Sequence, residues 1–297
     1  MRKTYQILLL FSLFVAPLQA AIGEHRKEGQ FNPCRRIVSM APSITGILKA
    51  FHLVDNIVGV SRYDREELSK RGAKDIGGYL DPNYEAILSL NPSVVLLVKE
   101  QRNTAQKLRS LGLKTALVEH REIKGILISV KKIGEICGMH QRAERIAKRL
   151  STELKRLRAR YTRFGTKRVL VVIGGKTPNF SGAYLAGVDT YYTSLLKAVN
   201  GENVVSTKTI PLSGVSLETL ISLKPDVVLF IAPEDMGYRA LARYKSNLLT
   251  EWTAIKTASP LRDARIYLLT GKEAYIPSLD FVFLAKKIGR LIHRKTR

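Results

Sequence analysis

The sequence predicts an α/β protein of two lobes that are joined by one long α-helix. Three observations support this fold class: short apolar runs alternate with stretches of helical spacing, the alternation pauses and restarts, and the pause is a long amphipathic stretch. Alternating buried strands and helices are typical of a parallel sheet that is covered by helices on both faces. The pause therefore divides the chain into two such sheets.

In the first half of the chain, four short runs rich in Val, Ile and Leu predict buried strands. These runs are Ile37 to Met40, Ile57 to Val60, Val94 to Val98 and Thr115 to Val118. Apolar residues at helical spacing predict helices between the runs. The helical stretches are Ile44 to Leu53, Tyr84 to Leu90 and Thr104 to Leu111. We expect this first lobe to span residues 35–140.

The long amphipathic stretch runs from Gln141 to Arg163 and contains neither Gly nor Pro. Apolar residues on one face recur at i, i+3, i+4 spacing, which predicts a single helix. The other face is basic and carries Arg142, Arg145, Lys148, Arg149, Lys155, Arg156, Arg158 and Arg160. A solvated face is the expected explanation, with nucleic acid or anionic lipid as the alternative partner. We predict that residues 141–164 form a rigid connector.

The second lobe is predicted over residues 165–297. Its buried strands are expected at Val169 to Ile173, Val227 to Ile231 and Ile266 to Leu269. Its helices are expected near Tyr191 to Val199, Leu217 to Leu223 and Leu279 to Ile292.

The N-terminus has the organisation of a cleaved secretory signal peptide. Arg2 and Lys3 precede an apolar run of ten residues, Ile7 to Ala16, and the small residue Ala20 follows shortly after. A helix that spans a bilayer needs ~20 residues, so this run is too short to be an anchor. We therefore expect export from the cytoplasm and removal of residues 1–20.

The charge of the chain is unusual, with 49 Lys and Arg against 25 Asp and Glu and a formal net charge of +24. Removing residues 1–20 takes away two bases and no acids, which leaves 24 − 2 = +22. An exported basic protein meets anionic membranes, cell-wall polymers and anionic ligands rather than nucleic acid. The ordinary explanation is a solvated basic surface.

The only two cysteines are Cys34 and Cys137. In an oxidising compartment they can pair, and the bond would tether the segment before the first strand to a helix end. The sequence does not supply the distance between them, so both the paired and the free state stay open.

A block of thirteen residues occurs twice. Glu85 to Leu97 matches Glu218 to Phe230 at seven of thirteen positions, and each copy reads as a helix, a proline turn and a buried strand. Units of helix, proline turn and strand recur in many proteins because proline cannot continue a helix, and this alone explains the shared Pro and Val residues. A glutamate opens the helix in both copies, either because it gains ~0.3–1 kcal/mol at a helix N-terminus or because the two share a role.

Motifs of catalysis are scarce. The chain has no G-x-S-x-G, Walker A, C-x-x-C or H-E-x-x-H motif, and its five histidines show no ligand spacing. We therefore expect no enzyme, no metal site of its own and no cofactor. An exported α/β enzyme and a basic surface or nucleic-acid binder are the rival classes.

Four segments together resemble the periplasmic binding proteins of ABC importers for cobalamin, iron siderophores and haem. They are Arg35 to Tyr63, Ile76 to Leu97, Val215 to Phe230 and Trp252 to Leu269. The resemblance implies two Rossmann-like lobes joined by one long helix, with the ligand in the cleft between them. It implies a periplasmic monomer that passes a small metal chelate, as cargo rather than cofactor, to a permease dimer in the inner membrane.

The resemblance also implies site residues. Tyr63, Tyr79 and Phe180 occupy positions of cleft aromatics, and Tyr184 is a nearby candidate. Flat aromatic walls suit a macrocycle and a phenol can ligate haem iron, whereas ordinary packing is the alternative. Glu85 and Glu218 match the carboxylates, one per lobe, that dock on arginines of the permease.

Some positions depart from the family pattern. Gly46 stands where the family often has Glu, and Val98 and Leu212 stand where cobalamin binders offer tryptophans, which weakens cobalamin as the specific ligand. Three cations follow strand ends, where open α/β sheets bind ligands, and favour an anionic chelate. They are Arg62, Lys99 and Arg102.

Overall fold

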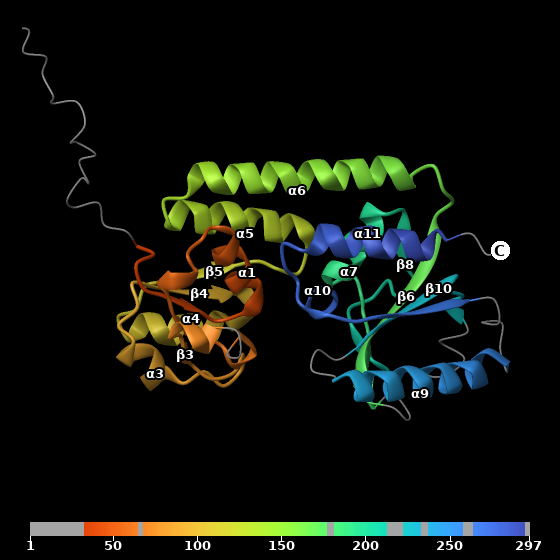
Figure 1. Cartoon of the computed structure of the whole chain (residues 1–297), viewed down its shortest axis with the longest axis horizontal. Coiled ribbons are helices and arrows are strands. Elements are labelled where there is room, and N and C mark those ends of the chain that lie inside the picture. The colour runs from red at the N-terminus through yellow and green to blue at the C-terminus, as the bar shows by residue number, and fades with distance from the viewer. Residues whose placement is uncertain are drawn as a thin grey trace, which may run out of the picture. The chain divides into compact units, whose positions relative to one another are not determined.

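The computed structural model describes residues 33–64, 68–176, 181–212, 222–232, 237–257 and 264–294. These residues form two β-sheets with helices packed on both faces of each sheet (Figure 1). The sequence prediction of an α/β protein with two sheets is confirmed. The proposed signal peptide, residues 1–20, lies outside the described residues.

The first sheet is fully parallel, with the strand order β3-β2-β1-β4-β5. Its strands are β1 (Ile37–Ser39), β2 (Ile57–Val60), β3 (Lys74–Asp75), β4 (Val94–Val98) and β5 (Thr115–Val118). Every residue of β4 is buried, as expected for a strand covered on both faces. Four of the five strands were predicted. The two residues of β3 are too few and too polar to give an apolar signal.

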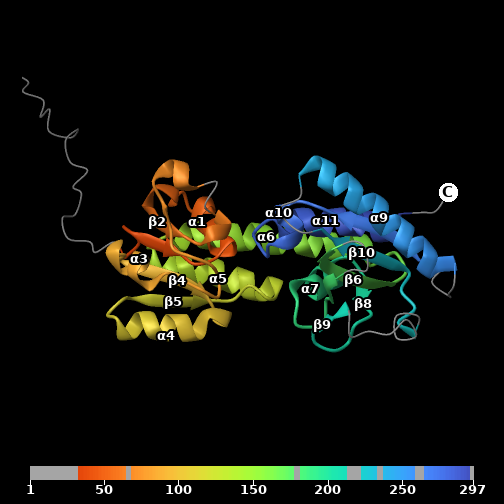
Figure 2. The ribbon, with the colours of Figure 1, turned by 90° about the horizontal axis from the view of Figure 1, so that it is seen from below.

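Helices cover both faces of this first sheet. Residues of α1 (Pro42–Ala50) and α5 (Ile123–Ile136), such as Ile44 and Ile133, belong to the core on one face. Ile87 of α3 (Tyr84–Ser89) and Leu108 of α4 (Arg102–Ser110) belong to the core on the other face. Figure 2 shows α4 lying along β5 at the edge of the sheet.

The second sheet has the order β11-β10-β6-β7-β9, and β8 also pairs with β6. Its strands are β6 (Lys167–Lys176), β7 (Ser181–Leu185), β8 (Gly201–Asn203), β9 (Ile210–Pro211), β10 (Val227–Ile231) and β11 (Arg265–Leu269). The expectation of a parallel sheet was wrong at one side, because β7 is antiparallel to β6 and to β9. Only four residues separate β6 from β7, too few for the crossover that a parallel pair needs.

The helices of the second half also lie on two faces. Core residues of α7 (Tyr191–Ala198) and α11 (Phe281–Ile292) pack on one face, and Tyr244 and Leu248 of α9 (Tyr238–Thr257) pack on the other. The one-turn helix α10 (Lys272–Tyr275) precedes α11. The predicted helix at Leu217 to Leu223 lies mostly outside the described residues. Within the described ranges, no helix combines the length and the apolar character needed to cross a bilayer.

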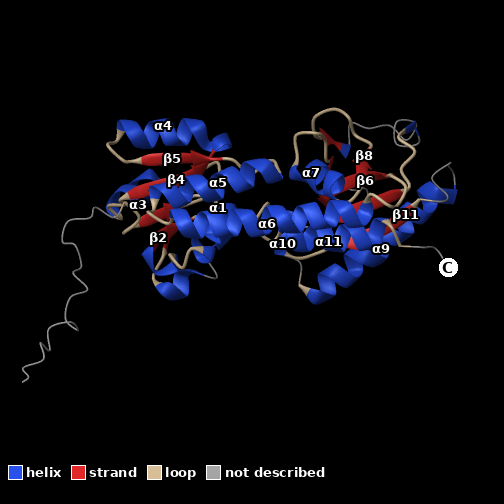
Figure 3. Cartoon of the chain, turned by 90° about the horizontal axis from the view of Figure 1, so that it is seen from above, coloured by secondary structure: helices blue, strands red, loops and turns tan. Residues whose placement is uncertain are grey.

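The long helix α6 (His140–Tyr161) has 22 residues and lies in the chain between the two sheets. Ala143 near its start belongs to a core of the first sheet, whereas Leu150, Leu157 and Tyr161 belong to a core of the second. Ile146 packs against both cores. A single helix therefore contributes to the cores of both sheets. Figure 3 gives a view onto α6.

Cys34 and Cys137 form a disulfide, which decides the choice that the sequence left open. Their Cα atoms are 5.1 Å apart, and the bond closes a loop of 103 residues. It joins the segment before β1 to the residue that ends α5.

Candidate functional site

Polar and aromatic residues gather where the parallel strands of the first sheet end. Residues 61–64 follow β2, residues 76–79 follow β3, residues 99–101 follow β4 and residues 119–121 follow β5. The carboxyl ends of parallel strands lie at one edge of a sheet, and in open α/β sheets this edge is where ligands bind.

A cavity of about 390 Å³ opens beside this edge. Its wall combines α1, the 3₁₀ turn that follows β2, the middle of α6 and the segment that runs from α10 to the start of α11. The lining residues are Pro42, Gly46, Lys49, Ala50, Tyr63, Asp64, Ile146, Arg149, Leu150, Lys272, Glu273, Ile276, Ser278, Leu279 and Asp280. A cavity of this size lies within the range of small-molecule sites, ~300–1,000 Å³.

Tyr63 is the sequence-predicted site residue that the structure places in this cavity. Its side chain is 55% exposed, so the ring is available to a bound molecule. The neighbouring Asp64 is buried, and its carboxylate accepts a hydrogen bond of 2.8 Å from the Thr45 hydroxyl. The Thr45 hydroxyl also shares a hydrogen bond of 2.8 Å with Ser39. This chain of polar contacts fixes the turn that carries Tyr63.

Gly46 also lines the cavity, at the position where the sequence departs from the family pattern. A Cβ atom added here would have a single neighbour within 4 Å, the Cβ of Ser278 at 4.0 Å. The missing side chain therefore enlarges the cavity between α1 and the segment before α11.

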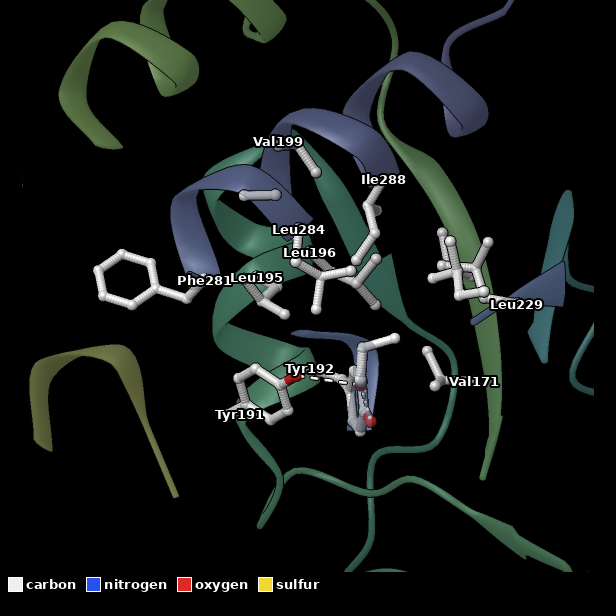
Figure 4. Close-up of a cluster of buried hydrophobic side chains, with 14 of the residues drawn as sticks. Val171, Tyr191, Tyr192, Leu195, Leu196, Val199, Leu229, Phe281, Leu284 and Ile288 are labelled. Atoms are coloured by element: carbon white, nitrogen blue, oxygen red, sulfur yellow. Dashed lines mark hydrogen bonds between the residues drawn. The ribbon is translucent and has the colours of Figure 1, made fainter. Parts of the chain in front are cut away.

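Two buried tyrosines anchor the opposite wall, which sequence reasoning did not identify. Tyr191 and Tyr192 project from α7 in the core beside the second sheet (Figure 4). The Tyr192 hydroxyl donates to the carbonyl oxygen of Ala274 at 2.6 Å. The Tyr191 hydroxyl shares its proton between the backbone carbonyl oxygens of Glu273 and Ala274, at 3.2 and 3.1 Å. Burial raises the pKa of both phenols, so they stay protonated and able to donate. These bonds hold α10, which carries Lys272 and Glu273 into the cavity wall.

Tyr79 lies at the same sheet edge as Tyr63 but is not part of the cavity lining. The ring is partly buried against the core of the first sheet, and Gln101 donates a hydrogen bond of 3.1 Å to its carbonyl oxygen. Burial and the charge of Glu100 raise the pKa of Tyr79, although Arg121 opposes them. The phenol is therefore neutral at every physiological pH.

A network of charged side chains surrounds Glu100 at this edge. His120 Nε2 lies 3.4 Å from Glu100 Oε2, and Arg121 also pairs with Glu100. The other ring nitrogen of His120 is 3.2 Å from the Ser43 hydroxyl. Burial opposes ionisation of Glu100, but the hydrogen bond from His120 and the nearby positive charges outweigh it and lower its pKa to about 2.

Two of the three cations that sequence analysis assigned to an anionic ligand have protein partners. Lys99 pairs with Glu119 at 3.2 Å, and Arg62 pairs with Asp81 at 3.5 Å. Arg102 is exposed in the first turn of α4. The cavity lining contains three other cations, none of which was predicted to contact the ligand. They are Lys49, Arg149 and Lys272.

The two remaining aromatic candidates are outside the cavity lining or outside the described residues. Tyr184 is 47% exposed in β7, opposite Ile173 of β6. Its neighbours Ala183 and Leu185 point to the buried core on the other face, because side chains alternate along a strand. Phe180 lies outside the described residues.

Glu85 is exposed in the first turn of α3. Asn83 caps this helix by accepting a hydrogen bond of 2.9 Å from the Ala86 amide, so the helix start does not depend on Glu85. No ion pair of Glu85 occurs among the described residues. Glu218, its predicted counterpart, lies outside them.

In the part of the chain that the structure describes, no three His, Cys, Asp or Glu side chains group closely enough to hold a metal ion. What the cavity offers is a phenol ring, an apolar surface and charges of both signs. This combination suits binding of a polar molecule with a large apolar body.

Comparisons with known proteins agree with this geometry. A family profile described as "Periplasmic binding protein" matches residues 37–257. The chain is 25% identical over 224 residues to a vitamin B12-binding protein of Yersinia pseudotuberculosis, covering 75% of this chain and 74% of that protein.

Two solved structures share the fold. An ABC transporter substrate-binding protein from Listeria monocytogenes has a TM-score of 0.69 at 18% identity, over 88% of this chain and 99% of the other. A periplasmic haem-binding protein from Pseudomonas aeruginosa has a TM-score of 0.71 at 19% identity, over 89% of this chain and 94% of the other.

Proposed function

The chain belongs to the periplasmic binding protein family, whose members bind rather than transform their ligands, and we propose that it captures a bulky iron chelate, haem or corrinoid for an ABC importer. The observation that carries this proposal is the cavity of about 390 Å³, because its lining comes from segments before, within and after α6. A molecule bound there touches both halves of the chain at once. Binding at such a site therefore depends on how the two lobes are placed relative to each other.

The relatives support a large metal chelate as the ligand class. One relative is named for vitamin B12 and one structural neighbour for haem. Corrin and porphyrin macrocycles both combine a flat or bulky apolar body with a few polar groups at the rim. The Listeria monocytogenes neighbour is a substrate-binding protein of an ABC transporter, which supports delivery to such a permease.

The chemistry of the cavity fits such a ligand. Tyr63 supplies an exposed aromatic ring against which a macrocycle can pack. Lys49, Arg149 and Lys272 can receive anionic rim groups such as carboxylates. We assign Tyr63 as the principal ligand contact.

The other aromatic residues are proposed as secondary contacts. Tyr79 lies at the same sheet edge, and its phenol is protonated, so it would approach a ligand as a hydrogen-bond donor. Tyr184 has an exposed ring and would contribute apolar surface. Phe180, outside the described residues, completes this set.

Delivery requires a surface that the permease recognises. We propose that Glu85 and Glu218 each meet an arginine of one permease subunit in the inner membrane. The exposure of Glu85 and the presence of a separate cap, Asn83, support this role, because neither packing nor the helix start needs the carboxylate. The partner is a dimer, and the binding protein acts as a monomer.

The lobes are proposed to span residues 35–140 and 165–297, with residues 141–164 as the connecting helix. The continuous helix α6 and its contribution to both cores support limited rocking of the lobes rather than a wide hinge closure. We further propose that residues 1–20 are removed on export and that the protein works in the periplasm.

A thermal-shift screen with haem, cobalamin and ferric siderophores tests the function. A ligand that binds only the native state adds ~2.7 kcal/mol of stability at 100 times its Kd. We expect one chelate to raise the melting temperature without being consumed, and its absorption spectrum to change on binding. No shift with any of the three classes would reject the proposed ligand class.

A further inference from the structure

The outward face of α6 is strongly basic. Eight of its 22 residues are Lys or Arg and two are Glu. The basic residues that the structure places at the exposed surface are Arg145, Lys148, Arg149, Lys155, Arg156, Arg158 and Arg160. The eighth, Arg142, is partly buried and donates a hydrogen bond of 2.7 Å to the carbonyl oxygen of Ala50.

The two acidic residues of α6 do not neutralise this face. Glu144 pairs at 2.8 Å with Lys131 of the neighbouring α5. Glu153 pairs with Arg156 and with Lys286 of α11, each at 2.8 Å. Both carboxylates are thus occupied, in part by cations from the flanking helices.

The Arg160 guanidinium lies over the Tyr161 ring, 5.8 Å from its centroid. Four other cations of the face have no ion-pair partner among the described residues and do not line the cavity. They are Arg145, Lys148, Lys155 and Arg158. A rise of ~1.5 Å per residue spreads them over roughly 20 Å of helix. Their spacing of three, seven and three residues keeps them on one side. We name these four residues the α6 basic face.

We propose that the α6 basic face docks the protein on the surface of an anionic lipid bilayer. This inference rests on the proposed function, because a periplasmic protein that serves a membrane permease works beside such a surface. Each Lys or Arg near an anionic bilayer contributes ~1 kcal/mol of attraction, which falls off within a Debye length of ~8 Å. The net charge of +22 (24 − 2) that remains after removal of residues 1–20 adds a longer-range attraction of the same sign.

The binding is electrostatic and reversible. The exposed uncharged residues Gln141, Thr152 and Ala159 of the same helix offer no large apolar side chain for insertion among lipid chains. Nucleic acid presents similar phosphates, but it is not a partner in the compartment where the protein is proposed to act. The bilayer is therefore the occupant that fits.

Docking on lipid and docking on the permease use different surfaces. The core residue Ile87 of α3, the helix that carries Glu85, lies on the opposite face of the first sheet from Ala143 of α6. A protein adsorbed through the α6 basic face therefore turns α3 away from that bilayer. Adsorption is a holding state that alternates with delivery.

Sedimentation of the mature protein with lipid vesicles tests this inference. We expect binding to vesicles of equal parts phosphatidylglycerol and phosphatidylcholine, none to pure phosphatidylcholine, and release by high salt. Replacing Arg145, Lys148, Lys155 and Arg158 with Gln removes four charges and retains helix propensity. The apparent affinity should fall more than about tenfold.

The control variant replaces Lys107, Arg109, Arg239 and Lys245 with Gln. These exposed cations of α4 and α9 give the same change in net charge away from α6. The control should bind anionic vesicles within about threefold of wild type. An equal loss of vesicle affinity in both variants would show that binding depends on net charge rather than on the α6 basic face, and would overturn the proposal.

Two other results would also overturn it: wild type that does not bind phosphatidylglycerol vesicles, or wild type that binds duplex DNA through these residues but not the vesicles. Both variants should keep the thermal shift with the chelate. Failure of wild type to bind the vesicles, together with a normal thermal shift, rejects only this inference, whereas no thermal shift of wild type with haem, cobalamin or a ferric siderophore rejects the proposed function.

Discussion

The hydroxyl of Tyr192 donates a hydrogen bond of 2.6 Å to the carbonyl oxygen of Ala274, 82 residues along the chain. The bond joins α7 in a buried core to α10 in the wall of the cavity. The Tyr191 hydroxyl contacts the same carbonyl oxygen at 3.1 Å, and the shorter bond from Tyr192 contributes most to holding α10 in position.

Replacing Tyr192 with Phe should therefore affect both folding and binding. We expect the free energy of unfolding to fall by about 1 kcal/mol and the Kd for the chelate to rise several-fold, because α10 carries Lys272 and Glu273. Chemical denaturation and ligand titration measure the two effects. The variant Tyr84→Phe, in α3 away from the cavity, is the matched control. A loss of stability with an unchanged Kd would show that α10 does not need this anchor.

The network around Glu100 predicts a pH dependence of stability. The pKa of Glu100 is lowered to about 2 in the folded protein from an ordinary value of 4.5. Its stabilisation is therefore fully present above about pH 4.5 and is lost as the pH falls toward 2. Glu100→Gln should remove on the order of 2 kcal/mol at neutral pH and flatten this acid limb.

The exposed Glu144→Gln serves as the control for this measurement, because its side chain is 63% exposed and its ion pair is solvent-screened. The free energy of unfolding of the three proteins is measured by chemical denaturation from about pH 2 to about pH 7. If the stability of Glu100→Gln falls at low pH as steeply as that of wild type, other groups cause the acid loss of stability.

The disulfide predicts a large effect of reduction. Closing a loop of 103 residues stabilises a fold by ~4.7 kcal/mol in the chain-entropy model. Reductant should lower the free energy of unfolding by about this amount, and the double variant Cys34→Ala with Cys137→Ala should behave like the reduced protein. Reductant should then have no effect on the double variant. A reductant effect that persists without the cysteines would contradict the assignment.

Charge reversal separates docking from capture. Glu85→Lys and Glu218→Lys, singly and together, should abolish transport and leave the fold and the Kd for the chelate nearly unchanged. Truncating one partner of a desolvated charge pair costs ~2–5 kcal/mol, and reversal adds repulsion. Glu135→Lys, at an exposed acid of α5, is the control. Normal uptake by the double variant would remove the docking role. A large rise in the Kd would instead place the glutamates at the ligand.

The central strands were predictable because they are continuous apolar runs. β4 and β10 occur at the predicted residues, since strands covered on both faces need apolar side chains at every position. β2 and the edge strand β5 also occur where predicted. The helix α5 was missed. Its glycines weaken the helical signal, and Gly134 is required by packing, because a Cβ there would lie 2.4 Å from the Cβ of Ala143 in α6. Such contacts between helices leave no local pattern.

The site was only partly predictable for the same reason. Tyr63 was found through the resemblance to a family, and the structure places it in the cavity. Gly46 and Ser278 are 232 positions apart in the sequence (278 − 46). They lie next to each other because α1 packs against the segment before α11. The role of Tyr192 depends on a backbone acceptor, which has no sequence signature.

Titration of the chelate into wild type, Gly46→Ala and Gly46→Leu tests the central claim most directly. Gly46→Ala adds one atom that contacts only Ser278 at 4.0 Å, so it should keep the affinity and gain up to ~1 kcal/mol of helix stability. Gly46→Leu fills part of the cavity and should raise the Kd more than about tenfold while the protein stays folded. Saturable binding without turnover, lost selectively in Gly46→Leu, is the predicted result. Equal affinity in all three proteins, or no saturable binding of haem, cobalamin or a ferric siderophore, would contradict the account.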